Sequence, residues 1–101
     1  MVYITQLIYL KTGAEAIFDA FEAVAIPIIA KYQGVLLFRL RPSQASDFLE
    51  AQMDLPYEIH LVSFPTEAEF EAFLADEERR QFLHLKEQSI RASFLYKGVQ
   101  L

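Results

Sequence analysis

The chain of 101 residues contains no cysteine and no tryptophan, and it has only three glycines and four prolines. Without cysteine, the protein can form no disulfide, no thiolate zinc site and no iron–sulfur cluster, and it has no cysteine nucleophile. Its isolated glycines, Gly13, Gly34 and Gly98, cannot make a glycine-rich phosphate loop. Because a cysteine-free chain fits a reducing compartment, we expect a cytoplasmic protein.

Basic residues are also scarce: nine Lys and Arg face 14 Asp and Glu, so the formal net charge is −5. Because proteins bind nucleic acid mainly by neutralising phosphates with basic side chains, we expect no nucleic-acid partner. Long apolar runs are missing as well. The longest uncharged stretch of the first predicted helix, 23–30, is far shorter than the roughly 20 residues that span a bilayer. Segment 1–6 lacks the basic region of a signal peptide, and we expect no membrane association.

Apolar residues are abundant and make up 53% of the chain, slightly more than is usual for a soluble domain. The length is that of one domain, so we expect a single domain over residues 1–101. A domain of this size has a limited interior. Part of its apolar surface is therefore expected to lie against a partner chain.

Periodicity predicts four strands and two helical regions. Strand patterns rich in Val, Ile, Leu, Phe and Tyr occupy 2–10, 35–41, 57–64 and 93–98. Residues 42–56 are irregular, and a segment of that length is typical of a lid or a partner contact.

The first helix is predicted from apolar residues at helical spacing: Ile17, Phe21, Val24, Ile28 and Tyr32. Glu15, Asp19 and Glu22 are assigned to its polar face. Pro27 is expected to kink this helix, and Gly34 is expected to end it.

The second helical region is predicted from its capping residues. Thr66 and Glu69 have the spacing of a capping box, and Asp76 marks the start of a further helical segment.

The element order is strand, helix, strand, strand, helices, strand. With right-handed crossovers, this order gives an α+β, ferredoxin-like βαββαβ fold whose antiparallel sheet has the order 4-1-3-2 and helices on one face. RNA-recognition domains share this order, but 57–64 lacks their basic, glycine-containing aromatic motif. Val35, Leu37 and Val62 are assigned to the other face, which is too apolar for open water. We expect a second sheet or a ligand to cover it.

Three segments resemble the dimeric α/β-barrel superfamily. They are the helical run 18–34, which ends in Pro-Ile-Ile-Ala-Lys-Tyr-Gln-Gly, the strand end Val-Ser-Phe-Pro-Thr at 62–66, and Leu-Tyr-Lys-Gly at 95–98. The resemblance is nearest to small bacterial domains of unknown function, and more distant to antibiotic-biosynthesis monooxygenase-like and NIPSNAP-like proteins. It implies a homodimer in which two sheets face each other around a central space. It implies no particular activity, because the superfamily includes oxygenases, isomerases, haem-degrading enzymes and proteins without known chemistry.

His60 is the main candidate for chemistry. It shares a strand face with Glu58, and Arg39 and Arg41 are expected to point to the same face from the neighbouring strand, opposite Leu36, Phe38 and Leu40. An imidazole beside a carboxylate in a semi-buried cavity can act as a general base near neutral pH. Glu58 would orient the ring, and an arginine would stabilise an anion. The alternative is a structural network in which these groups satisfy one another.

Tyr3 and Tyr9 are expected on that same face, where their phenols could bind a ligand or belong to an interface. If the first strand is turned over, Gln6 is the inward polar group instead. His84 is expected to be solvated, and two distant histidines predict no metal site.

These residues support two hypotheses. In the first, the protein binds a small hydrophobic or aromatic molecule in or beside the dimer barrel, for example as an oxygenase or isomerase that needs no cofactor. His60 and Glu58 are then catalytic, Arg39, Arg41, Tyr3 and Tyr9 bind the ligand, and 42–56 is a lid. In the second, the protein is a non-catalytic dimerisation or regulatory module whose apolar faces pack together.

Overall fold

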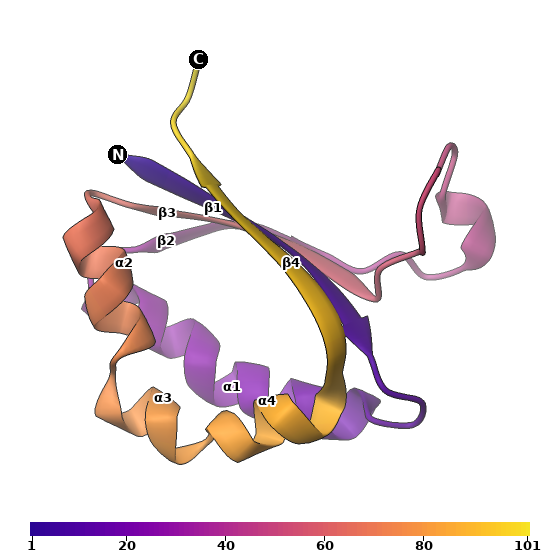
Figure 1. Cartoon of the computed structure of the whole chain (residues 1–101), viewed down its shortest axis with the longest axis horizontal. Coiled ribbons are helices and arrows are strands. Elements are labelled where there is room, and N and C mark those ends of the chain that lie inside the picture. Colours follow the sequence, from indigo (N-terminus) through magenta and orange to yellow (C-terminus); the bar gives the residue numbers. More distant parts are fainter.

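The computed structural model describes all 101 residues as one antiparallel sheet with helices against one face (Figure 1). The strands are β1 (Val2–Leu10), β2 (Val35–Leu40), β3 (Glu58–Phe64) and β4 (Ile90–Gly98), and their order across the sheet is β2-β3-β1-β4. This is the predicted order 4-1-3-2 counted from the opposite edge. The prediction of an α+β, ferredoxin-like fold is confirmed.

Four α-helices complete the fold: α1 (Glu15–Lys31), α2 (Glu67–Leu74), α3 (Glu77–Gln81) and α4 (Leu83–Ser89). None of them combines the length and the apolar composition that crossing a membrane requires. A single-turn 3₁₀ helix, η1 (Ala45–Asp47), lies within the long connection between β2 and β3.

The end of α1 differs from the prediction by one residue. Gln33, with φ of 58°, takes the left-handed position that was assigned to Gly34. Gly34 is needed for a different reason, because a Cβ at this residue would lie 2.6 Å from side-chain atoms of both Ile29 and Phe64. The helix also continues through Pro27.

The predicted starts of α2 and α3 are confirmed by their side-chain caps. The Thr66 hydroxyl accepts a hydrogen bond from the backbone N–H of Ala68 and also contacts the carboxylate of Glu69. The Asp76 carboxylate accepts a hydrogen bond from the backbone N–H of Arg79 at 2.9 Å, and it also binds Lys31 and Tyr32. These contacts lower the pKa of Asp76, first through the Tyr32 hydroxyl.

The helix-facing side of the sheet holds the core. A cluster of buried side chains joins β1, β3 and α1: Val2, Ile4, Ile29, Val62 and Phe64. Phe70 and Phe73 of α2 pack against this cluster. Val62 therefore faces the helices, and its predicted place on the opposite face was wrong.

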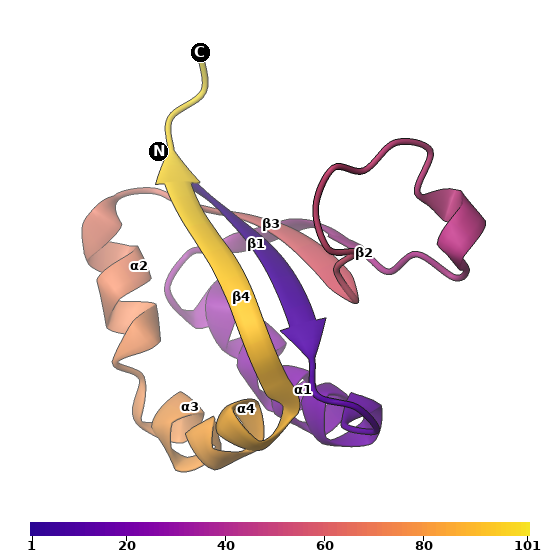
Figure 2. The same ribbon diagram turned by 45° about the vertical axis from the view of Figure 1, so that its right-hand side comes forward.

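The opposite side of the sheet, which we call the outer face, is apolar and largely uncovered. Its exposed large residues include Val35, Phe38, Leu40, Phe94 and Tyr96, each at least 40% exposed. The segment 42–57 lies on this side of the sheet, away from the helices (Figures 1 and 2). The Tyr9 hydroxyl donates a hydrogen bond to the backbone carbonyl of Asp54 at 2.9 Å, and Tyr9 is only 3% exposed.

Candidate functional site

The strand register brings three of the predicted site residues, Arg39, Glu58 and His60, together beneath α1. His60 of β3 is paired with Gln6 of β1 on one side and with Arg39 of β2 on the other. Glu58 lies two residues before His60, so both side chains are on the same face of the sheet. Both are buried, at 0% and 5% exposure.

That face is the helix-facing side, whereas the sequence analysis assigned His60 and Glu58 to the face that includes Val62 and is turned away from the helices. The physical reason is that Val62 and Phe64, further along β3, pack against Ile29 of α1. Strand alternation then carries Glu58 and His60 to the same side. Tyr3 and Tyr9, which were expected to join them, lie on the outer face.

A register shift between Leu36 and Phe38 positions the arginines. Strict alternation would place Leu36 and Arg39 on opposite faces of β2. With the shift, Leu36 pairs with Val62 and Arg39 with His60, so both lie on the helix-facing side. The prediction that Arg39 shares a face with His60 is confirmed, but the prediction that Leu36 shares a face with Phe38 and Leu40, opposite His60, was wrong.

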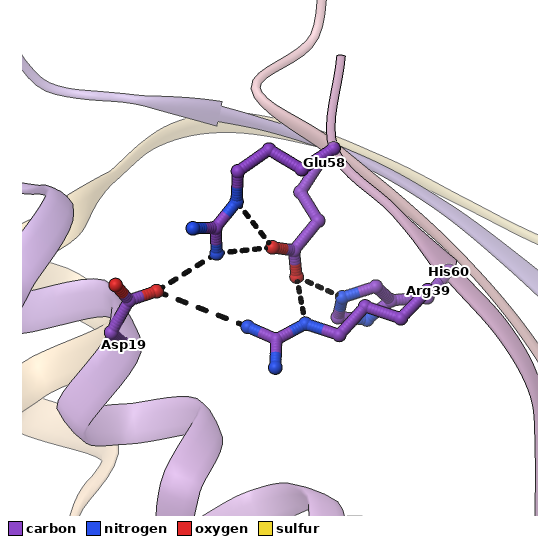
Figure 3. Close-up of polar contacts among 5 residues, drawn as sticks. Asp19, Arg39, Glu58 and His60 are labelled. Atoms are coloured by element: carbon purple, nitrogen blue, oxygen red, sulfur yellow. Dashed lines mark hydrogen bonds and ion pairs between the residues drawn. The ribbon is translucent and has the colours of Figure 1, made fainter. Parts of the chain in front are cut away.

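Glu58 is the centre of a charged network (Figure 3). Its Oε2 accepts hydrogen bonds from Arg39 Nε at 2.8 Å and from His60 Nε2. Its Oε1 accepts hydrogen bonds from Arg41 Nε at 3.0 Å and from Arg41 Nη2 at 2.5 Å. Burial acts to raise the pKa of Glu58, but the hydrogen bonds from His60, Arg39 and Arg41 outweigh it and lower the pKa to about 2. Glu58 is therefore an ionised acceptor at neutral pH.

Asp19 of α1 closes this network on its solvent side (Figure 3). Its Oδ1 lies 2.9 Å from Arg41 Nη2 and 3.9 Å from Arg39 Nη2. Two carboxylates thus balance two guanidinium groups. Arg39 and Arg41 both contact Glu58 and Asp19, as predicted for the alternative of a structural network.

The Glu58 contact also determines the state of the His60 ring. Because ionised Glu58 can only accept a hydrogen bond, Nε2 of His60 must be the donor. In the neutral ring, Nδ1 then carries the free lone pair. Nδ1 has no hydrogen-bond partner. Only one side-chain nitrogen or oxygen is both fully enclosed and without a partner, and it is Nε of Arg79. Nδ1 of His60 therefore remains in contact with open space.

His60 also lines a cavity of about 80 Å³ between the sheet and the helices, which we call the inner cavity. Five polar side chains from five elements line it: Gln6 of β1, Glu22 of α1, His60 of β3, Arg79 of α3 and Lys86 of α4. The rest of the lining is apolar and includes Phe21, Ile26, Phe70 and Phe73. Leu74 and Leu95 line its edge and are 36% and 50% exposed, so the cavity opens to solvent there.

The inner cavity holds unpaired charge. Glu22 is only 6% exposed and makes no hydrogen bond or ion pair, and burial raises its pKa. Arg79 is 8% exposed, and burial lowers its pKa; its Nη1 donates to the backbone carbonyl of Leu74, while its Nε has no partner. Burial, followed by the charge of Arg79, lowers the pKa of Lys86.

Glu22, Arg79 and Lys86 were not predicted as site residues, and Glu22 was predicted on the polar face of the first helix. A second set of inward-facing residues at helical spacing could have indicated that Glu22 is buried. It lies four residues after Phe18 and three before Ala25, and both of these are buried. Arg79 and Lys86 lie on the short helices α3 and α4. No pattern in these segments predicts that a basic side chain points into the protein.

The remaining predicted residues lie elsewhere. Tyr3 lines a wide, shallow hollow of about 440 Å³ on the outer face, together with Thr5, Leu61 and Tyr96. The Tyr9 hydroxyl is used to hold Asp54. His84 is exposed and stacks on Phe82. No group of three or more His, Asp or Glu side chains is arranged to hold a metal ion.

Comparison with known proteins shows the fold. No family model and no curated protein matches the chain. A protein of unknown function from Rhodopseudomonas palustris has a TM-score of 0.82 over 99% of this chain and 82% of its own, at 14% identity. A NIPSNAP family protein with unknown function from Agrobacterium tumefaciens has a TM-score of 0.69 over 97% and 86%, at 18% identity.

A DABB family protein with a ferredoxin-like fold from Mesorhizobium loti gives a TM-score of 0.67 over 99% of this chain and 96% of its own, at 16% identity. The solved structures thus include the NIPSNAP-like proteins that the sequence resembles. The chain has the ferredoxin-like fold that is described for two structures similar to it.

Proposed function

We propose that this protein binds a small, partly apolar molecule in the inner cavity, and that His60 and Glu22 transfer a proton to and from it. One observation carries the proposal: five polar side chains from separate elements meet at one cavity, and the buried carboxyl group of Glu22 has no partner in the protein. An unpaired buried polar group costs stability. Buried ionisable groups with shifted pKa values around a concave apolar space are typical of binding sites and active sites.

His60 is the proposed base. Its Nε2 is held by Glu58, which leaves Nδ1 to accept a proton from a bound molecule. Glu58 acts through His60 and is a positioning residue, with Arg39 and Arg41 keeping it ionised.

Glu22 is the proposed acid. Its pKa is raised by burial, so it can remain protonated closer to neutral pH than an exposed carboxyl group. A protonated carboxyl group can donate a hydrogen bond to a carbonyl oxygen as negative charge develops there. A base and an acid of this kind suit removal of a proton from the carbon next to a carbonyl group. Isomerisation and cofactor-independent oxygenation can both begin with that step.

The volume restricts the ligand. About 80 Å³ is roughly half the size of an engineered apolar cavity that admits benzene. The enclosed part therefore suits a group of a few heavy atoms. An aromatic ring would extend towards the edge formed by Leu74 and Leu95.

A second copy of the chain is the proposed partner for the outer face. The exposed apolar residues of that face, among them Phe38 and Phe94, form the kind of surface that a homodimer buries. A similar structure from Bacteroides fragilis is described as a dimeric protein with a ferredoxin-like fold. The inner cavity lies within one subunit, so the proposed site is not the central space between two sheets.

The alternative function is a non-catalytic dimerisation or regulatory module. The closed network of Asp19, Arg39, Arg41 and Glu58 favours it, because each of these charges already has a partner. In that case the inner cavity is an imperfection of packing. No compound should then bind or exchange deuterium in a way that depends on His60.

The two functions are separated by a binding and exchange experiment with acetone, 2-butanone, acetophenone and phenol. We expect at least one of these compounds to shift the protein NMR signals of residues lining the inner cavity. We also expect the protein to accelerate deuterium exchange next to the carbonyl group of a bound ketone, and His60→Ala to abolish that acceleration. His84→Ala is the matched control. If neither these compounds nor a small carboxylate shifts cavity signals, or if exchange persists in His60→Ala, the proposed function is wrong.

A further inference from the structure

The cation side of the inner cavity is formed by Arg79 and Lys86. Arg79 is more than nine-tenths buried, and its guanidinium carbon lies 5.1 Å from the centre of the Phe73 ring and 6.0 Å from that of the Phe21 ring. These aromatic rings position the guanidinium group. Its only hydrogen bond to the protein is the 3.3 Å contact of Nη1 with the Leu74 carbonyl, while Nε has none.

A buried guanidinium group with an unused donor is costly unless something accepts from it. Glu22 is near enough to influence the pKa of Arg79, but it forms no ion pair with Arg79 or Lys86 within 4.0 Å. The two cations also oppose each other, because the charge of Arg79 contributes to the lowered pKa of Lys86. Nη2 of Arg79 also has no hydrogen-bond partner and, unlike Nε, is not fully enclosed, so an added negative charge at Arg79 could accept from it and relieve this repulsion.

We infer that the molecule bound in the inner cavity is a compact carboxylate, with its carboxylate group on Arg79 and Lys86 and its apolar part against Phe21 and Phe73. This inference rests on the proposed function, since it assumes that the inner cavity is the binding site. Carboxylates match the planar donors of a guanidinium group, and lysine adds a point charge. The cavity volume of about 80 Å³ and the apolar lining limit the rest of the molecule to a short alkyl or similar group.

The orientation has a chemical consequence. A carboxylate held on Arg79 and Lys86 leaves Glu22 and His60, two of the three other polar groups of the lining, available to the adjacent part of the molecule. A 2-oxo acid would thus have its carboxylate bound by the two cations and its ketone near the proposed acid and base. Small 2-oxo acids are therefore the class of carboxylate that we infer as substrate.

The inference is tested by comparing isobutyrate with isobutyramide, which has nearly the same shape but no charge. Binding of each to the full chain is measured by NMR titration of the cavity residues. We expect isobutyrate to bind at least tenfold more tightly than isobutyramide. Arg79→Gln should remove this preference, while Arg80→Gln, a change at the exposed neighbouring residue, should preserve it. Arg79→Gln keeps the backbone N–H that caps α3, and Lys86→Gln provides a second test if Arg79→Gln does not fold.

The outcomes separate the two claims. If both compounds shift the cavity signals with equal affinity, the carboxylate inference is wrong and the proposed function stands. If neither isobutyrate, isobutyramide nor the ketones shift any cavity signal, the proposed function fails together with the inference. If isobutyrate binds only outside the cavity, or if its preference survives in both Arg79→Gln and Lys86→Gln, the inference is overturned.

Discussion

Glu58 accepts a hydrogen bond from Nε2 of His60, two residues later on the same face of β3, and both side chains are buried between the sheet and α1. Arg39 and Arg41 donate to the Glu58 carboxylate and balance its negative charge. The pair thus has two roles. Glu58 stabilises the junction of β2, β3 and α1, and it also orients the one histidine that reaches the inner cavity.

The first prediction concerns acid stability. The pKa of Glu58 is about 2 in the folded protein, below its ordinary value of 4.5, so folding is favoured by the ionised form. This contribution is complete above about pH 4.5 and is lost as the pH falls towards 2. Asp76, whose pKa is also lowered, acts in the same direction. The free energy of unfolding, measured with urea, should therefore decrease over this range.

Glu58→Gln separates the contribution of Glu58 from that of Asp76. At pH 7 the variant should lose about 2 kcal/mol, the scale of hydrogen bonds to a charged group. Its stability should then fall less steeply than that of the wild type between pH 4.5 and 2. Parallel curves for the two proteins would show that Glu58 does not have a depressed pKa.

The second prediction concerns Glu22, where the sign is opposite. Burial raises the pKa of Glu22 in the folded protein, so the ionised form opposes folding, and stability is lost as the pH rises above its ordinary value of 4.5. Glu22→Gln should therefore stabilise the protein at pH 7 by about 0.5 to 1 kcal/mol, while it abolishes the proposed proton transfer. Glu15→Gln, at an exposed position of the same helix, is the control and should change neither property. A Glu22→Gln variant that is less stable than wild type would indicate an internal partner for this carboxylate.

The sequence was sufficient for the topology, because strand and helix periodicity and crossover handedness are local properties. It was not sufficient for the side of the sheet on which β3 places Glu58 and His60. Alternation along β3 predicts which residues share a face, but not which face the helices cover; the packing of Val62 and Phe64 against Ile29 decides that. The same holds for Arg79, whose position in the cavity depends on how α3 packs against α1.

The third prediction compares the glycines. Gly34→Ala should destabilise the protein by about 2 kcal/mol, because its Cβ would meet Ile29 and Phe64 at 2.6 Å. Gly13→Ala should cost about 1 kcal/mol, because Gly13 has a φ of +77° but open space around it. Gly98→Ala has neither problem and should be close to neutral. Thermal or urea unfolding gives the ranking, and equal effects at Gly34 and Gly98 would contradict the packing at the end of α1.

The fourth prediction concerns the outer face. Phe94→Glu places a charge on the surface that we propose a second copy covers, so the variant should sediment as a monomer where the wild type sediments as a dimer. Ala20→Glu, on the exposed side of α1, should leave the dimer intact. A wild-type chain that is monomeric in sedimentation velocity would remove the case for self-association through this face.

The fifth prediction concerns the central claim, that His60 presents a free Nδ1 to a ligand in the inner cavity. It is tested most directly by recording the ¹⁵N spectrum of the histidine rings at pH 8, before and after addition of isobutyrate or a ketone from the panel. We expect Nε2 of His60 to carry the proton in the free protein and its Nδ1 resonance to shift on binding, while both ring nitrogens of His84 stay unchanged. A His60 protonated on Nδ1, or a His60 ring that responds to none of these compounds, would contradict the account.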